Sequence, residues 1–273
     1  DQVGSLFVDR MMYLYNRCLQ EEKFPEVLKL GEVRALFKSG DTQLTKNYRP
    51  ITLLSYLSKN LGSMIEARIQ KHLDNTGGLA EEQGGFRKGR SQVQQISTLI
   101  SILNDRKAND KNTAVIFLDV NKAYDQVWRK GLLYKLRQKG ITGKMWALIK
   151  SSLENIKRRM RAPVVIEGEL KLFETEEGVT QGAPESPVLY SIFINDLVDV
   201  LRDNGIGVRV SGVLRPALLF ADDIAIMVES VEEVHRSLRT VTEYARKWRF
   251  SFNGSKSAVM AWDGRGFRTR VKE

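Results

Sequence analysis

The feature that most constrains this chain is a pair of adjacent carboxylates, Asp222 and Asp223, set between two apolar runs. The runs Leu218–Ala221 and Ile224–Val228 are rich in branched and aromatic residues, which predicts a β-hairpin whose tight turn carries the acids. Two neighbouring anions repel each other, so folding alone gives little reason to place them between buried strands. A bound divalent cation would remove that repulsion. The alternative is a solvated turn, since aspartate is common in turns.

A third carboxylate, Asp119, ends the run Thr113–Val120, whose sequence TAVIFLDV is typical of a buried central strand. A carboxylate in that position requires a partner, a metal or a hydrated cleft. If this strand lies beside the hairpin, Asp119 meets Asp222 and Asp223 at one edge of a sheet. Oxygen ligands without histidine favour Mg²⁺ or Mn²⁺ over zinc, and two such ions about 3.5–4 Å apart promote in-line phosphoryl transfer.

Composition narrows the class of partner. Lys and Arg number 43 against 33 Asp and Glu, which gives a net charge of +10 and a pI of about 9.6. Such a surplus favours an anionic polymer, usually nucleic acid, although a basic surface can also serve solubility alone. The length of 273 residues and a hydrophobic content of 42% allow one large domain or two lobes.

The cellular setting is indicated by what the sequence lacks. Cys18 is the single cysteine, so an internal disulfide and a cysteine-rich zinc site are both excluded. No apolar run reaches transmembrane length, and no secretory signal pattern opens the chain. These observations predict an intracellular protein without membrane association. Because it begins at Asp1 rather than Met, the chain is interpreted as a piece of a longer protein.

Helical and strand patterns alternate along the rest of the chain. Helices are predicted over residues 3–20, 57–73 and 92–108 and from Ser230, and strands over 32–38, 113–120 and 250–262. A helix capped by Thr142 is predicted to continue through Ile156, followed by a hairpin over Val164–Phe173. This order predicts an α+β fold with a βαββαβ-like antiparallel sheet backed by helices on one face.

At this point the residues resemble a known family. Three segments resemble successive blocks of reverse transcriptases: Phe117–Asp125, Gln181–Pro187 and Phe220–Asp223. Two more, Asn47–Ile51 and Gly85–Arg90, resemble finger blocks of the non-LTR, LINE-type retrotransposon branch. The resemblance runs from about Phe24 to Trp262. A single block of this kind is weak, but five in the family's order are a specific signal.

The resemblance implies a right-hand polymerase architecture. Residues 1–112 would form the fingers with an N-terminal helix, and residues 113–262 a palm with the catalytic carboxylates. Part of 142–180 would extend the fingers or form a palm insertion. Residues 263–273 would be a flexible basic tail. The family's thumb should follow Trp262, so the chain is expected to lack it.

The resemblance also implies a role for individual residues. Asp119, Asp222 and Asp223, with the Val120 carbonyl, would bind two Mg²⁺ ions, with Mn²⁺ as a possible substitute. Lys38 and Arg49 would neutralise the incoming triphosphate, Tyr124 would form an aromatic gate under the sugar, and Gln181 would begin the loop that supports the nascent base pair. Lys256 would protonate departing pyrophosphate, unless it is simply a solvated hairpin lysine. Arg87, Lys88 and Arg90 would contact template phosphates.

The implied function is RNA-directed DNA polymerisation, which extends a primer 3′-hydroxyl with dNTPs on an RNA template. The partners would be an RNA–DNA hybrid, dNTPs and the rest of a larger polyprotein, and the parent element would act in the nucleus. An RNA-dependent RNA polymerase is disfavoured by Ala221 before the acids and by the aromatic Tyr124. A catalytically silent nucleic-acid-binding scaffold is disfavoured because all three carboxylates are present. Glu185 and Ser39 depart from the family pattern.

Overall fold

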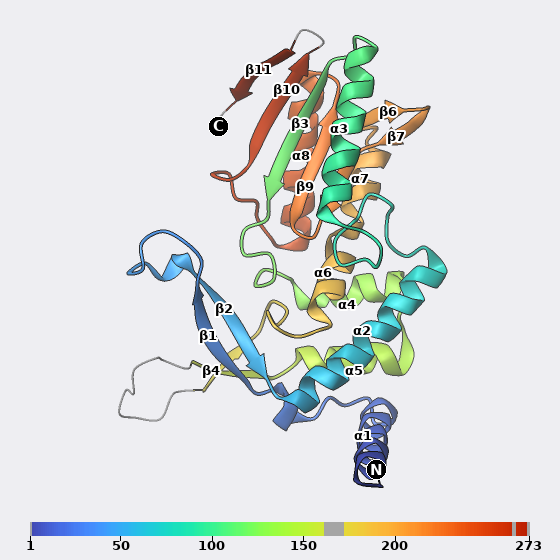
Figure 1. The fold of residues 1–273 in the computed structure, drawn as a ribbon, viewed down its shortest axis with the longest axis vertical. Helices are drawn as coiled ribbons and strands as arrows, with labels where there is room; N and C mark the ends of the chain where they lie inside the picture. The colour runs from blue at the N-terminus through green and yellow to red at the C-terminus, as the bar shows by residue number, and fades with distance from the viewer. Residues whose placement is uncertain (1, 161–171, 264–265, 272–273) are drawn as a thin grey trace. The chain divides into compact units, whose positions relative to one another are not determined.

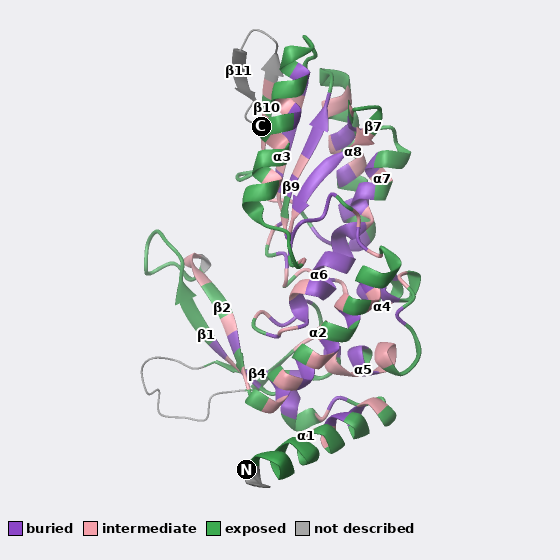
Figure 2. Cartoon of the chain, turned by 45° about the vertical axis from the view of Figure 1, so that its right-hand side comes forward, coloured by how far each residue is buried: buried purple, intermediate pink, exposed green. Residues whose placement is uncertain are grey.

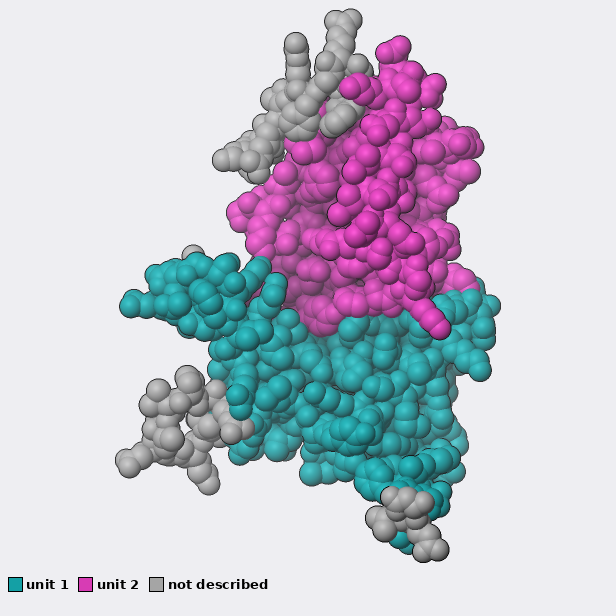
Figure 3. All heavy atoms as spheres, in the orientation of Figure 1, with its two compact units in different colours: residues 1–76, 129–188 teal, residues 77–128, 189–273 magenta. Residues whose placement is uncertain are grey.

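The computed structural model describes residues 2–160, 172–263 and 266–271 (Figure 1). The chain divides into two compact units, coloured separately in Figure 3: unit 1 holds residues 1–76 and 129–188, and unit 2 holds residues 77–128 and 189–273. Each unit is therefore built from two separate stretches of chain. The two units do not coincide with the predicted fingers (residues 1–112) and palm (residues 113–262). Residues 77–112 belong to unit 2, and residues 129–188 belong to unit 1.

Unit 2 contains a five-stranded sheet in the order β11-β10-β3-β9-β8, in which every neighbouring pair is antiparallel. Its strands are β3 (Thr113–Asp119), β8 (Ala217–Phe220), β9 (Asp223–Val228), β10 (Ala258–Asp263) and β11 (Gly266–Val271). The predicted central strand and acidic hairpin are thus confirmed: β3 is the middle strand, and β8 and β9 form the hairpin beside it.

Helices cover both faces of this sheet, as Figure 1 shows for α3 (Gln92–Ala108) and α8 (Val231–Trp248). Val115 packs with Ile102 of α3 in one apolar cluster. Ile116, the next residue along β3, points to the opposite face because side chains alternate along a strand. The prediction that helices back the sheet on one face only is wrong. A strand whose side chains are apolar on both faces must be covered on both sides.

The remaining elements of unit 2 are two helices and a small hairpin. Their bounds are α6 (Ser186–Asn195, which begins in unit 1), α7 (Leu197–Asp203), β6 (Val208–Val210) and β7 (Val213–Arg215). The C-terminal segment differs from the expected flexible tail, because residues 266–271 form β11 and pair with β10. Its sequence GFRTRV alternates apolar or β-branched residues with arginine, a strand pattern that its glycine and arginine content obscured.

Unit 1 combines a four-stranded sheet, in the order β2-β1-β4-β5, with helices. Its strands are β1 (Gly31–Phe37), β2 (Tyr48–Leu54), β4 (Ile156–Met160) and β5 (Leu172–Thr175). Its helices are α1 (Gln2–Gln20), α2 (Tyr56–Thr76), α4 (Arg129–Gln138) and α5 (Gly143–Leu153), with short 3-10 turns η1 (Glu26–Lys29) and η2 (Thr45–Asn47). β1 and β2 form an antiparallel hairpin, and β4 joins β1 in parallel.

The core of unit 1 includes the predicted stripe of α2, where Leu61, Ile65, Ile69 and Leu73 are each at most 2% exposed (Figure 2).

The helix capped by Thr142 was predicted to continue through Ile156, and this prediction is wrong. The helix α5 ends at Leu153, and Asn155 adopts a positive φ of 52°, a left-handed conformation that asparagine tolerates and that stops a helix. The turn of the hairpin predicted over Val164–Phe173 lies outside the described residues. Within the described ranges, no helix is long and apolar enough to cross a bilayer.

Candidate active site

Two of the three predicted carboxylates lie opposite each other on neighbouring strands. Asp119, the last residue of β3, pairs in register with Asp223, the first residue of β9. Directly opposed residues of an antiparallel pair project from the same face of the sheet, so these two carboxylates share a face. Asp222 precedes Asp223 in the turn between β8 and β9. The three carboxylates therefore gather at one end of the sheet of unit 2.

The turn that presents Asp222 has a constrained backbone. Phe220 pairs with Asp223, which leaves Ala221 and Asp222 as the two turn residues. Ala221 has a φ of 59°, and Asp222 does not share this positive φ, which is the pattern of a type II′ turn. Glycine usually fills that first position, so alanine there carries backbone strain of order 1–3 kcal/mol. A Cβ on Gly85 would lie 2.2 Å from the Ala221 amide nitrogen, so only glycine permits this approach.

Electrostatic repulsion acts among the carboxylates beside this turn. The pKa of Asp223 is raised by partial burial, which is the largest cause, and then by the charges of Asp222 and Asp119. The nearby Lys256 ammonium lowers the pKa of Asp223 and so opposes these effects. Lys256 donates a hydrogen bond from Nζ to Asp119 Oδ2 at 3.3 Å, and both side chains remain partly exposed. The cluster thus contains more negative charge than its protein partners neutralise. This is the electrostatic setting in which a cation binds favourably.

The backbone of Asp119 is fixed by the chain segment that carries Lys256. The Asp119 carbonyl accepts from the Asn253 amide at 2.8 Å, and the Asp119 amide donates to Ser257 Oγ at 3.4 Å. Val120 forms an isolated antiparallel bridge with Phe252. The bonds of that bridge use the Asp119 carbonyl and the neighbouring Asn121 amide, so the Val120 carbonyl takes no part in it. Ser257 and Asn253 were missed by the sequence analysis, because a short polar turn gives no signal of its long-range partner.

Tyr124 follows Asp119 by five residues and stacks on Tyr190, with ring centroids 5.5 Å apart and planes 9° from parallel. Burial, followed by the charge of Asp222, raises the pKa of Tyr124 to about 12, which places its ring near that carboxylate. Tyr190 is 1% exposed, and its hydroxyl has no hydrogen-bond partner among the described residues. The sequence did not single out Tyr190, because a tyrosine in a segment with helical periodicity looks like an ordinary core residue.

The predicted triphosphate residues lie on the β1–β2 hairpin of unit 1. Arg49 pairs with Leu36, and the Lys38 amide donates to Asn47 at 2.9 Å just beyond the end of β1. Continuing the alternation of the strand places Lys38 and Arg49 on the same face of the hairpin. Both residues are exposed.

Gln181 lies beside the same hairpin. Its carbonyl accepts from the Thr52 amide of β2 at 2.8 Å. Gly182, with a φ of 120°, lies so close to β2 that a Cβ would meet the Thr52 carbonyl oxygen at 2.3 Å. The predicted residues Lys38, Arg49 and Gln181 therefore all belong to unit 1, with Lys38 and Arg49 near the start of β2 and Gln181 beside Thr52. The three carboxylates, Tyr124 and Lys256 belong to unit 2.

Residues 83–91 form a glycine-rich loop in unit 2, and its three cations differ in their surroundings. Arg87 is only 16% exposed and donates from Nη1 to the Ala80 and Gln83 carbonyls. Arg90 forms an ion pair with Glu81. Lys88 is exposed. Arg87 thus stabilises its own loop, and Lys88 is the member of the set best placed for a solvent-side phosphate.

The donor chemistry of the carboxylate cluster fits a hard divalent cation. Three aspartates and a main-chain carbonyl supply oxygen alone, the ligand preferred by Mg²⁺ and Mn²⁺. Across the part of the chain that the structure describes, no three His, Cys, Asp or Glu side chains form a ready-made metal cage. Paired metal ions about 3.5–4 Å apart would require the three carboxylates to converge within about 4–8 Å, and this spacing is a prediction of the sequence that stays a prediction.

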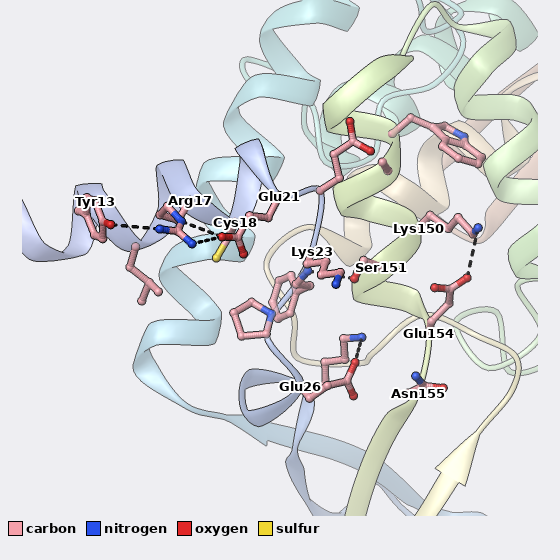
Figure 4. A pocket seen from close by; sticks show the side chains of 17 residues that line it. Tyr13, Arg17, Cys18, Glu21, Lys23, Glu26, Lys150, Ser151, Glu154 and Asn155 are labelled. Carbon is pink, nitrogen blue, oxygen red and sulfur yellow. Dashed lines mark hydrogen bonds and ion pairs between the residues drawn. The ribbon is translucent and has the colours of Figure 1, made fainter.

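A separate cavity of about 900 Å³ lies in unit 1 between α1, η1 and α5 (Figure 4). The ion pairs at its rim are Arg17 with Glu21, Lys29 with Glu26 and Lys150 with Glu154. None of the predicted site residues lines it.

An antiparallel sheet whose central strand ends in one carboxylate, opposite another carboxylate beside the turn of the neighbouring hairpin, defines the palm of a template-directed polymerase. Solved structures share the fold. Apo telomerase from Candida tropicalis, truncated from its C-terminal domain, matches 90% of this chain and 55% of its own with a TM-score of 0.67 and 12% identity. Telomerase from Candida albicans, in complex with a fragment of telomeric RNA, matches 90% and 45% with a TM-score of 0.64 and 10% identity.

The family model described as "Reverse transcriptase (RNA-dependent DNA polymerase)" matches residues 37–268, and the chain belongs to this family. The RNA-directed DNA polymerase from mobile element jockey of Drosophila funebris is 29% identical over 91% of this chain and 27% of its own length. The Pol polyprotein from retrotransposable element R2 of Popillia japonica is 28% identical over 82% of this chain and 31% of its own. The chain thus spans about a quarter to a third of the length of these relatives.

Glu185 is an unusual feature of the segment that carries Gln181. It is 9% exposed, its Oε2 has no hydrogen-bond partner among the described residues, and burial, followed by the nearby Glu66, raises its pKa to about 7. A raised folded-state pKa means that the native protein binds more protons than the unfolded chain between the two pKa values. Glu185 therefore lowers stability as the pH rises from about 4.5 to about 7.

We expect Glu185→Gln to be more stable than the natural chain at pH 8, by roughly 3 kcal/mol, and similar to it near pH 4.5. Urea unfolding of both proteins at the two pH values measures this. The exposed residue Glu154, replaced by glutamine, is the control and should show no such pH-dependent gain. Equal stability of Glu185→Gln and the natural chain at pH 8 would contradict the assignment.

Proposed function

We propose that this chain is the polymerase portion of a non-LTR retrotransposon protein and that it extends a primer 3′-hydroxyl with dNTPs on an RNA template. The observation that carries the proposal is the register of Asp119 with Asp223, beside Asp222, in a chain that belongs to the reverse transcriptase family. Relatives named as RNA-directed DNA polymerases from mobile elements support the choice of template and product. The longer protein would supply the further parts of the machinery.

In this proposal Asp119, Asp222, Asp223 and the Val120 carbonyl hold two Mg²⁺ ions, for which Mn²⁺ can substitute. When bound, such ions acidify the attacking hydroxyl and stabilise charge on the transferring phosphoryl group. The protein contributes the fixed positions of its oxygen atoms. The bridge at Val120 and the bond from Asn253 to the Asp119 carbonyl hold the end of β3 in place, so that little reorganisation is needed when the substrate arrives.

Other side chains orient the nucleotide and move its proton. Lys38 and Arg49 neutralise the triphosphate, Arg49 through its planar fork and Lys38 as a point charge. Tyr124 packs against the sugar, and the segment that begins at Gln181 supports the base pair. Lys256 releases Asp119 and donates a proton from Nζ to the departing pyrophosphate, acting as a general acid.

The glycine-rich loop binds the template backbone through Lys88 and Arg90, while Arg87 holds the loop in shape. We expect affinity for an RNA–DNA hybrid to fall steeply with salt, and Lys88→Gln to flatten the slope of log affinity against log salt by about one unit. Arg87→Gln should instead lower thermal stability, because two carbonyls lose their donor. Fluorescence anisotropy titrations at several salt concentrations, with thermal melts of each variant, measure both effects. An affinity insensitive to salt would contradict nucleic-acid binding.

The partners proposed for the chain are therefore an RNA template, a DNA primer and dNTPs, together with the rest of a larger polyprotein. We also propose that the parent element acts in the nucleus, where its primer would be found. This follows from the proposed reaction and from the mobile-element relatives.

A primer-extension assay on poly(rA)/oligo(dT) with Mg²⁺ tests the proposal. Since the chain spans a minor part of its relatives' length, the assay compares the 273-residue chain with a C-terminally extended version from the same source. Extension with dTTP by either protein supports the polymerase. Hybrid binding without extension by both would favour a catalytically silent scaffold instead.

A further inference from the structure

Arg129, the first residue of α4, is a buried arginine in unit 1 that the polymerase mechanism leaves unused. Its guanidinium makes four hydrogen bonds to one short stretch of chain, which comprises the last residue of β5 and the residues just after it. Nε donates to the Gly178 carbonyl at 2.9 Å, Nη1 to the Thr175 carbonyl at 2.6 Å, and Nη2 to the Glu177 carbonyl at 3.0 Å and to Thr175 Oγ1 at 3.1 Å. One side chain thus gathers three main-chain carbonyls from four consecutive residues.

This arrangement depends on the shape of arginine. A guanidinium carries five N–H donors in a rigid plane, so it can satisfy several acceptors that face it from different directions. A lysine ammonium has three donors at one point and cannot reach the same set. Burial, followed by the neighbouring Arg158, lowers the pKa of Arg129 to about 10, so the group is still charged at neutral pH. Two buried arginines close together repel each other and lose hydration, so the arrangement is unfavourable by itself. The carbonyls that accept hydrogen bonds from Arg129 offset this cost.

Two of the residues that Arg129 holds, Glu177 and Gly178, lie at the start of the Gln181 loop, which we define as residues 176–185. Three residues after Gly178, the Gln181 carbonyl accepts the Thr52 amide of β2, and Gly182 lies against the Thr52 carbonyl. The loop is therefore held in unit 1 by Arg129 at its start, by Arg158, whose Nη2 donates to Thr180 Oγ1 at 3.4 Å, and by β2 at Gln181. Among the described residues, Arg158 and the Thr52 amide each contribute one of these hydrogen bonds, whereas Arg129 makes two to the loop and two to Thr175 just before it. Arg129 is therefore the main polar anchor of the loop's start.

We propose that Arg129 is a positioning residue that fixes the Gln181 loop against β2 and thereby sets the binding of the incoming nucleotide. The role in nucleotide binding rests on the proposed polymerase function, whereas the anchoring of the loop does not. Arg129 does not touch the substrate in this account. It acts by keeping Gln181 and the edge of β2 in one arrangement.

The test replaces Arg129 with lysine, which keeps the charge and removes the planar fork. The matched control is Arg137→Lys on the same helix, where the exposed guanidinium stacks 3.8 Å from the centre of the Trp146 ring. Among the described residues, no loop carbonyl accepts a hydrogen bond from it. In Arg129→Lys, exchange of the Thr52 amide hydrogen should speed up about tenfold, because its acceptor on Gln181 is no longer held. Amides that join β1 to β2 should keep their exchange rates in both variants.

The kinetic measurement uses primer extension by the active version of the protein. Arg129→Lys should raise the KM for the complementary dNTP about tenfold with kcat within about threefold, the pattern expected when the nucleotide binds more weakly in the ground state and the transition state alike. Arg137→Lys should change neither. If the natural protein does not extend primers, the polymerase proposal fails, and the exchange of the Thr52 amide still decides whether Arg129 anchors the loop.

A milder variant keeps the inference testable if Arg129→Lys does not fold. Thr175→Val removes one of the four acceptors, Oγ1, and should speed exchange of the Thr52 amide in the same direction, by about twofold to threefold. Unchanged exchange of Thr52 in both folded variants would overturn the proposal. A uniform rise in exchange across unit 1 would also overturn it, because Arg129 would then be a general stabilising residue.

Discussion

Replacing Asp222 with asparagine is expected to lower the rate of primer extension by about three orders of magnitude, without loss of the fold. Asparagine has nearly the shape of aspartate but no charge with which to hold a cation or to balance the substrate phosphates. The same replacement should leave the melting temperature unchanged or raise it. Asp222 is one of the like charges that raise the pKa of Asp223, and removing it relieves that repulsion.

Single-turnover extension with saturating dNTP, together with a thermal melt, measures both effects. Asp203→Asn, at the exposed end of α7 in the same unit, is the control and should leave the rate within about twofold. A lost rate accompanied by a lost fold would point to a structural carboxylate. Retention of activity within tenfold of the natural chain would show that the cluster is not catalytic.

Replacing Tyr124 with valine is expected to reduce discrimination against ribonucleotides about 10²-fold, while incorporation of deoxyribonucleotides survives. The ring lies near Asp222 and is held flat against Tyr190, so it cannot easily turn away from an added hydroxyl. Collision with a 2′-hydroxyl is a repulsive device, and its removal admits the wrong sugar without weakening the right one.

Competition between matched ribonucleotides and deoxyribonucleotides in the extension assay measures this ratio. Tyr124→Phe is the matched control, because it keeps the ring and its stacking and should keep the discrimination. An equal loss of rate with both sugars would mean that Tyr124 is a packing residue.

The acidic hairpin and the strand of Asp119 were predictable because both are short apolar runs with a polar residue at a strand end, a pattern that few other structures explain. Their side-by-side arrangement is confirmed by the register of Asp119 with Asp223. The fold class followed from the order of the elements together with the family resemblance, and the structural likeness to telomerases confirms it.

Features that depend on distant contacts were not predictable. The discontinuous units arise from contacts between stretches more than 50 residues apart, which periodicity does not report. The end of α5 depends on one left-handed residue, Asn155, after a pattern that suits a helix and a strand equally. Arg129 reads in the sequence as one more surface cation, and only the carbonyls that surround it reveal its role.

The position of β3 in the middle of its sheet has a consequence for synthesis of the protein. Ala114 pairs with Val228 and Asp119 with Asp223, so the residues of this strand leave the ribosome 104–114 residues before their partners in β9, and still longer before those in β10. At roughly 5–20 residues per second, it waits on the order of 5–20 seconds with both edges unpaired. During that interval the segment AVIFL is an open template for association with other nascent chains. The strand that carries Asp119 is therefore exposed early in synthesis and stays so until β9 and β10 are made.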